Sequence, residues 1–180
     1  MAYWSRVVGV GAFAALIALM PVAAWAEEDT RETIELPDQV KEEFRAEMRE
    51  DMARLDEIVA ALAEGAFGQA ADIADINLTL GHKLWRNMAN QGATIKEIVA
   101  AREKMRGQGM LGKGLHGVGR FMPEHFRAMG VTMHEAAEAF ATAARQAAHP
   151  PVAEDYVRVL EKLQEMTGVC RACHETFRVP

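Results

Sequence analysis

The stretch Val169-Cys170-Arg171-Ala172-Cys173-His174 lies near the end of the chain and decides how the rest is interpreted. Its Cys-x-x-Cys-His spacing is typical of a c-type haem attachment site. Two thiols three residues apart on a helix reach the two vinyl groups on one edge of a porphyrin. The histidine that follows is then carried beneath the iron, where its imidazole is the proximal ligand. We therefore expect one covalent haem c, held by Cys170, Cys173 and His174.

Other uses of the two cysteines fit the sequence less well. Cys170 and Cys173 are the only cysteines in the chain, so no disulfide or four-thiolate metal site competes for them. A thioredoxin-like redox site would need a strand and a βαβ pattern around the motif, and the sequence has neither.

The first 26 residues predict export from the cytoplasm. Arg6 is followed by an apolar run over residues 7–20, and Ala24-Trp25-Ala26 closes the segment. A basic start, an apolar middle and an Ala-x-Ala end are typical of a secretory signal peptide. We expect cleavage after Ala26 and a periplasmic protein, where haem c is attached. The alternative is an uncleaved membrane anchor, but the run is shorter than the roughly 18 to 20 residues that a spanning helix needs.

Charge and composition narrow the class of protein. Arg6 is the only charge in the signal segment, so the remaining chain carries 19 Lys+Arg against 26 Asp+Glu, a net charge of −7. We expect no nucleic-acid partner for so acidic a chain. It would suit a redox partner protein with a basic patch, which charge alone does not identify. Half of the residues are apolar and few are aromatic; with abundant alanine and methionine, this composition indicates a helical bundle.

Apolar residues at steps of three and four predict four long helices. The first begins at Pro37 and ends at Gly65, the second spans residues 69–88, the third begins at Pro123, and the fourth begins near Val152. The first inward stripe is Val40, Phe44, Met48, Met52, Leu55, Val59 and Leu62, and the second is Ile73, Ile76, Leu80, Leu84 and Met88. The third is Phe126, Met129, Met133, Ala137, Phe140, Ala144 and Ala147, and the fourth is Tyr156, Leu160, Leu163, Thr167, Cys170, Cys173 and Phe177.

Two segments lack this regularity. Residues 27–36 are acidic and aperiodic, and we expect a flexible lead-in. Residues 90–122 form an irregular insert, in which Thr94 and Glu97 fit a capping box before a short helix. Six glycines between Gly107 and Gly119 predict a mobile loop.

Four long amphipathic helices with mostly short connections predict an all-α, antiparallel four-helix bundle. The bundle would occupy residues 37–180 as one domain, after the signal peptide and the lead-in. Because Cys170 and Cys173 belong to the inward stripe of the C-terminal helix, we expect the haem to be buried among helices.

The chain resembles the cytochrome c prime family and its low-spin relatives, which are periplasmic haem c proteins. The resemblance rests on the ending "VCRACHETFR" in the last turns of the C-terminal helix, the export signal, and a first helix rich in methionine and arginine. It covers residues 37–89 and 123–179. The common small cytochromes c carry the motif near the N-terminus, so its C-terminal position is the specific part.

The resemblance implies roles for individual residues near the haem. Cys170 and Cys173 match the thioether cysteines, and His174 matches the proximal ligand. Arg178 matches a basic residue beside the proximal face, although a cation is also favoured at a helix C-terminus by the dipole. Gly168 either lets the porphyrin approach the backbone or marks an irregularity of the helix.

The family's first helix faces the distal side of the haem. In low-spin members a methionine of this helix ligates the iron, and here Met48, with Met52 as alternative, matches that position. A thioether is a soft ligand that raises the potential of haem iron, whereas a methionine on an apolar stripe is otherwise ordinary core. Arg45 and Arg49 lie near the family's propionate-pairing base, and a solvated arginine is the alternative for each.

The insert at residues 90–122 departs from the family, which leaves the haem-edge surroundings and a family-like homodimer contact open. The histidines outside the motif are not spaced as a metal site on one helical face; they are His82, His116, His125, His134 and His149. Of these, His116 in the glycine-rich loop is the one that could reach a metal or the iron, with a solvated loop histidine as the alternative.

Two functions remain open at this stage. The first is a periplasmic electron carrier whose iron is bound by His174 and a methionine. The second is a gas-binding protein, with five-coordinate iron and an apolar distal pocket for nitric oxide or carbon monoxide. A metal-binding or scaffolding bundle is a third reading. We expect no enzyme, because the sequence places no distal acid–base histidine beside an arginine, as a peroxidase would need.

Overall fold

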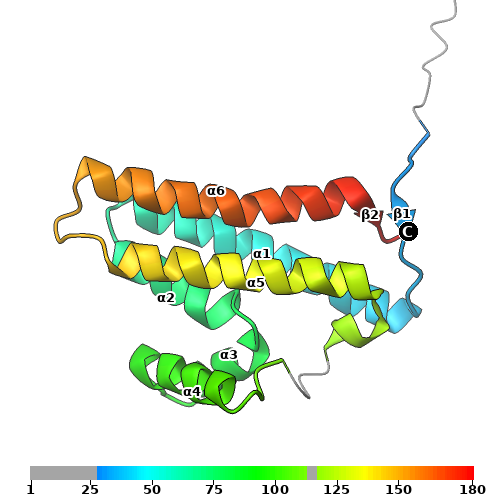
Figure 1. The fold of residues 1–180 in the computed structure, drawn as a ribbon, viewed down its shortest axis with the longest axis horizontal. Helices are drawn as coiled ribbons and strands as arrows, with labels where there is room; N and C mark the ends of the chain where they lie inside the picture. Colours follow the sequence, from blue (N-terminus) through cyan, green and yellow to red (C-terminus); the bar gives the residue numbers. More distant parts are fainter. Residues whose placement is uncertain (1–27, 113–116) are drawn as a thin grey trace, which may run out of the picture. The chain divides into compact units, whose positions relative to one another are not determined.

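The computed structural model describes residues 28–112 and 117–180. Within them the chain forms six α-helices, one short 3-10 helix and two strands of two residues each (Figure 1). The expectation of an all-α protein is thereby confirmed. The predicted signal peptide, residues 1–26, lies outside the described residues, and so do Gly114 and His116 of the glycine-rich segment.

The elements follow one another along the unit Arg31–Pro180. They are β1 (Glu32–Thr33), α1 (Asp38–Ala63), α2 (Phe67–Asn77), α3 (His82–Asn90), α4 (Ile95–Gly107), η1 (Val118–Phe121), α5 (Glu124–Arg145), α6 (Ala153–Thr176) and β2 (Phe177–Arg178).

Three of the four predicted long helices begin where the sequence indicates. Pro37 and Pro123 directly precede α1 and α5, since proline fits the start of a helix, where its missing N–H is not needed. Gly65, with φ of +72°, ends α1 in the left-handed region that glycine adopts without strain. The capping box before α4 is also confirmed, because Thr94 and Glu97 each accept from the other's backbone N–H.

The predicted second helix over residues 69–88 is wrong, because the chain breaks it into α2 and α3. Gly81 has φ of +90°, and the Trp85 ring lies 3.0–3.2 Å from where a Cβ at Gly81 would stand. Trp85 is fully buried and its indole N–H donates to the Leu80 carbonyl. The turn therefore needs glycine for both conformation and space. The buried face of α2 is also not the predicted isoleucine stripe; its members are Phe67, Ala70, Ala71, Ala74 and Asp75.

The inward stripes of α1 and α6 are also only partly as predicted. Met52 and Val59 on α1 are 67% and 53% exposed, and Leu160 on α6 is 48% exposed. The fully buried positions nearby are Ile58 on α1 and Val159 on α6. Helix α1 packs closely on α2, α2 on α5, and α5 on α6, but α1 and α6 are not a closely packed pair. The side chains on the facing edges of α1 and α6 are consequently more exposed than those that face α2 and α5.

Two hydrophobic clusters contain most of the buried apolar side chains of the described residues; Trp85 and Ile98 are buried outside them. The larger cluster is built from α1, α2, α5 and α6 and centres on Ile58, Phe140, Val159 and Met166. The smaller cluster, here called the end cluster, consists of Ile34, Leu36, Met122 and Phe177, with Phe44, Phe126 and Cys173 packed against it.

The segment before α1 is not the flexible lead-in that the sequence predicted. Glu32–Thr33 pairs in parallel with Phe177–Arg178, and the Ile34 N–H donates to the Arg178 carbonyl at 2.8 Å. Ile34 and Leu36 are buried in the end cluster. The alternation of Ile34 and Leu36 with charged residues is the strand-like pattern that accounts for this pairing.

A buried ion-pair network attaches α4 to the rest of the protein. Arg102 on α4 lies 2.7 Å from Asp75 on α2 and donates to the Thr79 hydroxyl at 3.0 Å. Arg145 on α5 pairs with the other oxygen of Asp75. Asp75 and Arg102 are almost completely buried. Two guanidinium groups thus share one buried carboxylate, which compensates the cost of removing the charges from water.

We predict that Arg102→Ala lowers the free energy of unfolding by about 3 kcal/mol, because it leaves a buried carboxylate with one partner fewer. Arg106→Ala, one turn along α4 and paired with Glu138 at the surface, is the matched control and should cost less than about 1 kcal/mol. Urea unfolding followed by circular dichroism measures both. Equal losses in the two variants would contradict the proposed role of the buried network.

Candidate functional site

Helix α6 presents the motif at the end of the chain. Cys170 and Cys173 are free thiols and both are half-buried, and His174 is exposed. Cys173 packs against the end cluster. Helix α6 is continuous from Ala153 to Thr176, so it holds the two thiols and the imidazole within little more than one turn.

The surroundings of the two thiols raise their pKa values. For Cys170 the main cause is burial, and the carboxylate of Asp51 on α1 adds to it. For Cys173 the causes are burial and the neighbouring Cys170. The effect of Asp51 on Cys170 means that this part of α1 faces the motif. Neither thiol has the lowered pKa typical of a reactive redox cysteine.

A cluster of polar side chains, here called the polar cluster, lies beside the motif and past the end of α2. It consists of Glu47 and Asp51 on α1, His82 and Lys83 on α3, and His134 on α5. Lys83 Nζ lies 2.5 Å from Glu47, and His82 Nε2 lies 3.9 Å from the same carboxylate. The His82 and His134 rings are 5.6 Å apart. His134 Nδ1 donates to the Leu78 carbonyl at 2.7 Å.

The pKa values of Glu47, Asp51, Lys83 and His134 are all shifted within the polar cluster, and that of Lys83 is raised by its bonds to Glu47 and Glu43 against the effect of burial. Burial raises the pKa of Asp51 to about 6. Burial also acts to raise the pKa of Glu47, but the interactions with His82 and Lys83 outweigh it and lower that pKa to about 2. Burial lowers the pKa of His134, the Leu78 hydrogen bond opposes this, and His82 lowers it further. The pKa values of Glu47 and Asp51, one turn apart on α1, are therefore shifted in opposite directions.

Sequence reasoning missed this cluster. The available signal was that Glu47 and Asp51 are four residues apart and directly precede Met48 and Met52 of the predicted inward stripe. His82 and His134 could not be brought together from sequence, because their contact depends on the break at Gly81. Among the described residues, no three His, Cys, Asp or Glu side chains are arranged so as to hold a metal ion. The His82 Nδ1 atom is buried and has no hydrogen-bond partner among them.

The two methionines proposed as distal ligands differ in position. Met48 is half-buried, whereas Met52 is 67% exposed. Glu43, Glu47 and Glu50 contact α3 through Lys83 and Arg86, so they define the α3 side of α1. Met48 and Met52, with Leu55 and Val59, occupy the other edge. This is the edge beside the loosely packed boundary with α6, and Met48 is the one of the two that is turned further inward.

The arginines implied by the resemblance have other contacts in the structure. Arg45 donates to Glu42 and to the Pro180 carbonyl at 3.0 Å each, and Arg49 is exposed. Arg178 follows the end of α6 in β2, where its Nε donates to the Thr33 hydroxyl at 2.9 Å. The expected roles of all three toward a propionate or the proximal face stay predictions.

Gly168 lies two residues before Cys170 and does not disturb the helix. Helix α6 runs through it without a break, which removes the irregularity considered from the sequence. A Cβ at Gly168 would meet no atom closer than 3.8 Å. Glycine inside a helix costs about 1 kcal/mol relative to alanine, and no protein atom explains its presence here.

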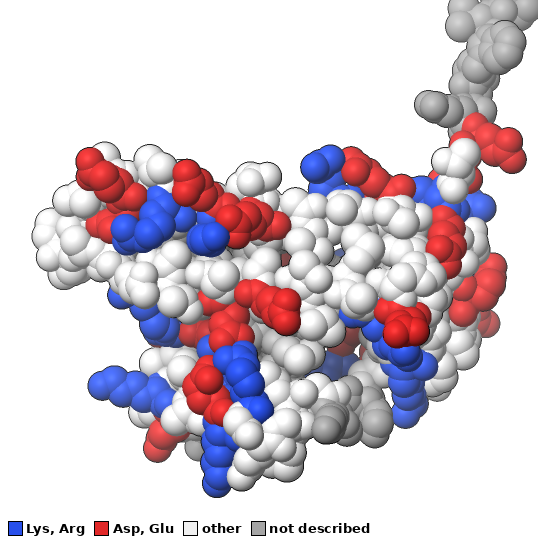
Figure 2. All heavy atoms as spheres, in the orientation of Figure 1, with Lys and Arg blue, Asp and Glu red and all other residues white. Residues whose placement is uncertain are grey.

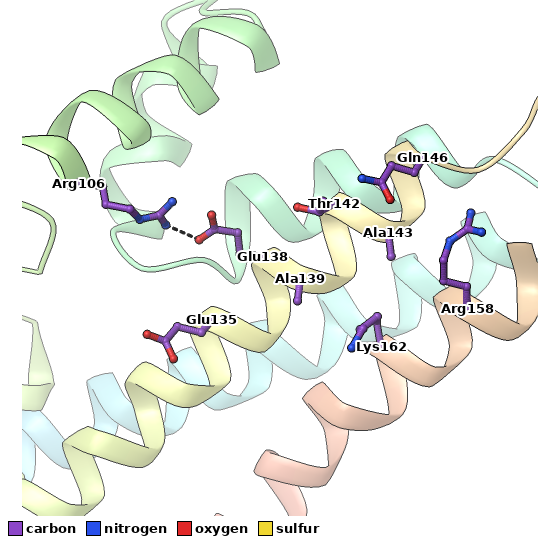
Figure 3. Close-up of a pocket in the computed structure, with 9 residues that line it drawn as sticks. All are labelled: Arg106, Glu135, Glu138, Ala139, Thr142, Ala143, Gln146, Arg158 and Lys162. Carbon is purple, nitrogen blue, oxygen red and sulfur yellow. Dashed lines mark hydrogen bonds and ion pairs between the residues drawn. The ribbon is translucent and has the colours of Figure 1, made fainter.

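One surface groove, shown in Figure 3, is lined by residues outside the motif. It measures about 560 Å³ between α4, α5 and the first turns of α6. Its walls carry charges of both signs, and Arg106 reaches across from α4 to Glu138. It has no cysteine or histidine in its lining, so it does not contribute to the candidate site.

No protein-family model, no curated protein and no solved structure matches the chain. None of the described helices is long and apolar enough to cross a membrane. The function must therefore be argued from the chain's own residues.

We predict that Asp51→Asn stabilises the protein at neutral pH. The Asp51 carboxyl has an unfolded pKa near 3.8 and a folded pKa of about 6, so the wild type loses stability as pH rises between these values. The loss is complete about one pH unit above the folded pKa and amounts to about 3 kcal/mol. The variant should regain up to that amount at pH 7.5, and the difference should vanish below about pH 4.

Urea unfolding at both pH values measures the effect, and Asp56→Asn is the matched control on an exposed position of α1. The control should change stability by less than about 0.5 kcal/mol. An Asp51→Asn variant less stable than the wild type at pH 7.5 would contradict the prediction.

Proposed function

We propose that the protein is a periplasmic c-type cytochrome that carries electrons through one covalent haem c. In this proposal α1, α2 with α3, α5 and α6 make an antiparallel four-helix bundle of the cytochrome c prime type, with α6 as the haem-attachment helix. The observation that carries the proposal is the free, half-buried Cys170–Cys173 pair followed by His174 on one continuous helix.

The donor set suits covalent attachment. Both cysteines are unpaired and protonated at neutral pH, which leaves them available to form thioethers with vinyl groups. At Gly168 on α6, an added Cβ would meet no atom closer than Gln164 Nε2 at 3.8 Å. The boundary between α1 and α6 is the loosely packed one, so a flat group tied to α6 is accommodated there with the least displacement of helices.

Each residue then has a definite task. Cys170 and Cys173 would tie the group to α6, and His174 and Met48 on α1 would be the protein's nitrogen and sulfur ligands to its iron. When bound, the haem supplies the iron that accepts and releases one electron. Phe126, which packs against the end cluster as Cys173 does, would limit water on that side, and a thioether ligand with a dry surrounding raises the potential.

The molecular surface suits transient contact with another protein. Lys and Arg side chains alternate with Asp and Glu over the face in Figure 2, so that face has no large patch of one sign. His174 is exposed at the end of α6, which keeps the proposed ligand close to the surface. A short path from ligand to surface favours electron exchange with a partner over catalysis in a closed pocket.

We predict that the protein, exported in a host with a haem-attachment system, keeps its haem through acid–acetone extraction. Thioether bonds survive this treatment, whereas an axial ligand alone does not. Cys173→Ala should leave at most one thioether, and His174→Ala should lose the proximal ligand and keep the covalent bonds. Haem staining of denaturing gels and the reduced pyridine spectrum measure these outcomes. Haem that extracts fully from the wild type would refute the proposal.

We predict that Met48→Ala converts low-spin ferric iron to high-spin and allows rapid carbon monoxide binding in the ferrous state. The reason is loss of the proposed sulfur ligand, seen as loss of the weak near-infrared sulfur-to-iron band. Met52→Ala is the matched control one turn away; its side chain is mostly exposed, so it should leave the spectrum and the stability nearly unchanged. A wild-type protein already high-spin, with rapid carbon monoxide binding, would instead indicate the gas-binding function.

A further inference from the structure

The residues just before α1 form a strap over the end of the proposed haem-attachment helix. The strap is defined here as residues 31–36. Glu32 and Thr33 pair in parallel with Phe177 and Arg178, the residues that directly follow α6. The Ile34 N–H and the Thr33 hydroxyl both bond to Arg178, at 2.8 Å and 2.9 Å. The strap thus holds the chain three to four residues beyond His174.

One contact reaches the ligand residue itself. Arg31 Nη1 donates to the main-chain carbonyl of His174 at 3.2 Å. The last carbonyls of a helix have no partner within the helix, and in α6 the Phe177 N–H already bonds to the Cys173 carbonyl. Arg31 therefore supplies a partner for the next carbonyl along. The final turn of α6, which otherwise would fray, is held at both Cys173 and His174.

The strap is anchored by buried apolar side chains and by a link to α5. Ile34 and Leu36 are 3% and 7% exposed and pack with Phe177 in the end cluster, against which Cys173 also packs. The Phe177 ring makes an edge contact with Phe126 at 5.0 Å. Glu32 bonds to His125 on α5 at 2.9 Å. The strap is consequently a fixed part of the structure, and it contacts both α5 and the end of α6.

We propose that the strap is a positioning element for the proximal ligand, with Arg31 and Ile34 as its principal residues. It fixes the last turn of α6, so that the His174 imidazole keeps a single orientation toward the iron. This inference rests on the proposed haem c function. If the helix terminus lacked this support, the His174 imidazole could rotate away from the iron toward solvent, because its side chain is exposed.

The test compares the full-length holoprotein with Arg31→Ala and Ile34→Asp. All of these proteins also carry Met48→Ala, because ferrous haem iron shows an iron–histidine stretching band in resonance Raman spectra only when its sixth position is free. The band then reports the orientation and strength of the His174 bond. We expect one narrow band when the strap is unchanged. In each variant we expect a second or broadened band carrying at least about a tenth of the intensity, together with a shifted reduction midpoint. Arg31→Lys, which restores a cationic donor, should recover most of the wild-type band.

Controls separate positioning from general stability. Arg127→Ala removes an exposed arginine of α5 at the same end of the molecule and should leave the band unchanged. If Ile34→Asp does not fold, Arg31→Ala alone decides the question. An unchanged band in Arg31→Ala would overturn the proposal, even if its unfolding midpoint falls, because a merely structural role predicts that combination. A wild type without covalent haem would overturn the proposed function and, with it, the inference. A haem-bearing wild type with unaffected variants would overturn the inference alone.

Discussion

The early end of α2 at Asn77 is the constraint from which much of the structure follows. Gly81 turns the chain in the left-handed region and lies against the buried Trp85 ring, so the second long helix cannot continue. Helices α3 and α4 fold back instead, and Arg102 must enter the interior to meet Asp75. The freed Leu78 carbonyl accepts a hydrogen bond from His134 Nδ1. The polar cluster of Glu47, Asp51, His82, Lys83 and His134 stands past this end of α2.

That cluster lies beside Cys170, the first thiol of the proposed attachment site. Asp51 acts electrostatically on both Cys170 and His82, which places the polar groups and the motif within each other's field. A low local dielectric makes such interactions strong. The interior of this protein is therefore apolar in its two hydrophobic clusters and ionisable beside the motif. An environment of this kind ties the charge of a bound group to the protonation of its neighbours.

The sequence predicted the features that depend on local chemistry. Pro37, Pro123 and the prolines before Val152 predict where α1, α5 and α6 begin. Thr94, with Glu97 three residues later, predicts the capping box of α4. The sequence did not predict what depends on contacts between distant residues. Met52 and Leu160 fit their apolar stripes, but their exposure follows from which helices pack closely. The pairing of residues 31–36 with β2, and the meeting of His82 with His134, could not be inferred from periodicity.

The strap also bears on the order in which the chain folds. Its contacts with the end of α6 and with β2 join residues 143 to 145 positions apart in sequence. Closing so long a loop in an unfolded chain costs about 4 kcal/mol of entropy by the logarithmic rule, and two residue pairs of strand return little against it. The helices must therefore come together first and bring both ends to the same place. The first residues of the folded unit are then among the last to find their position, and the end of α6 stays accessible until they do.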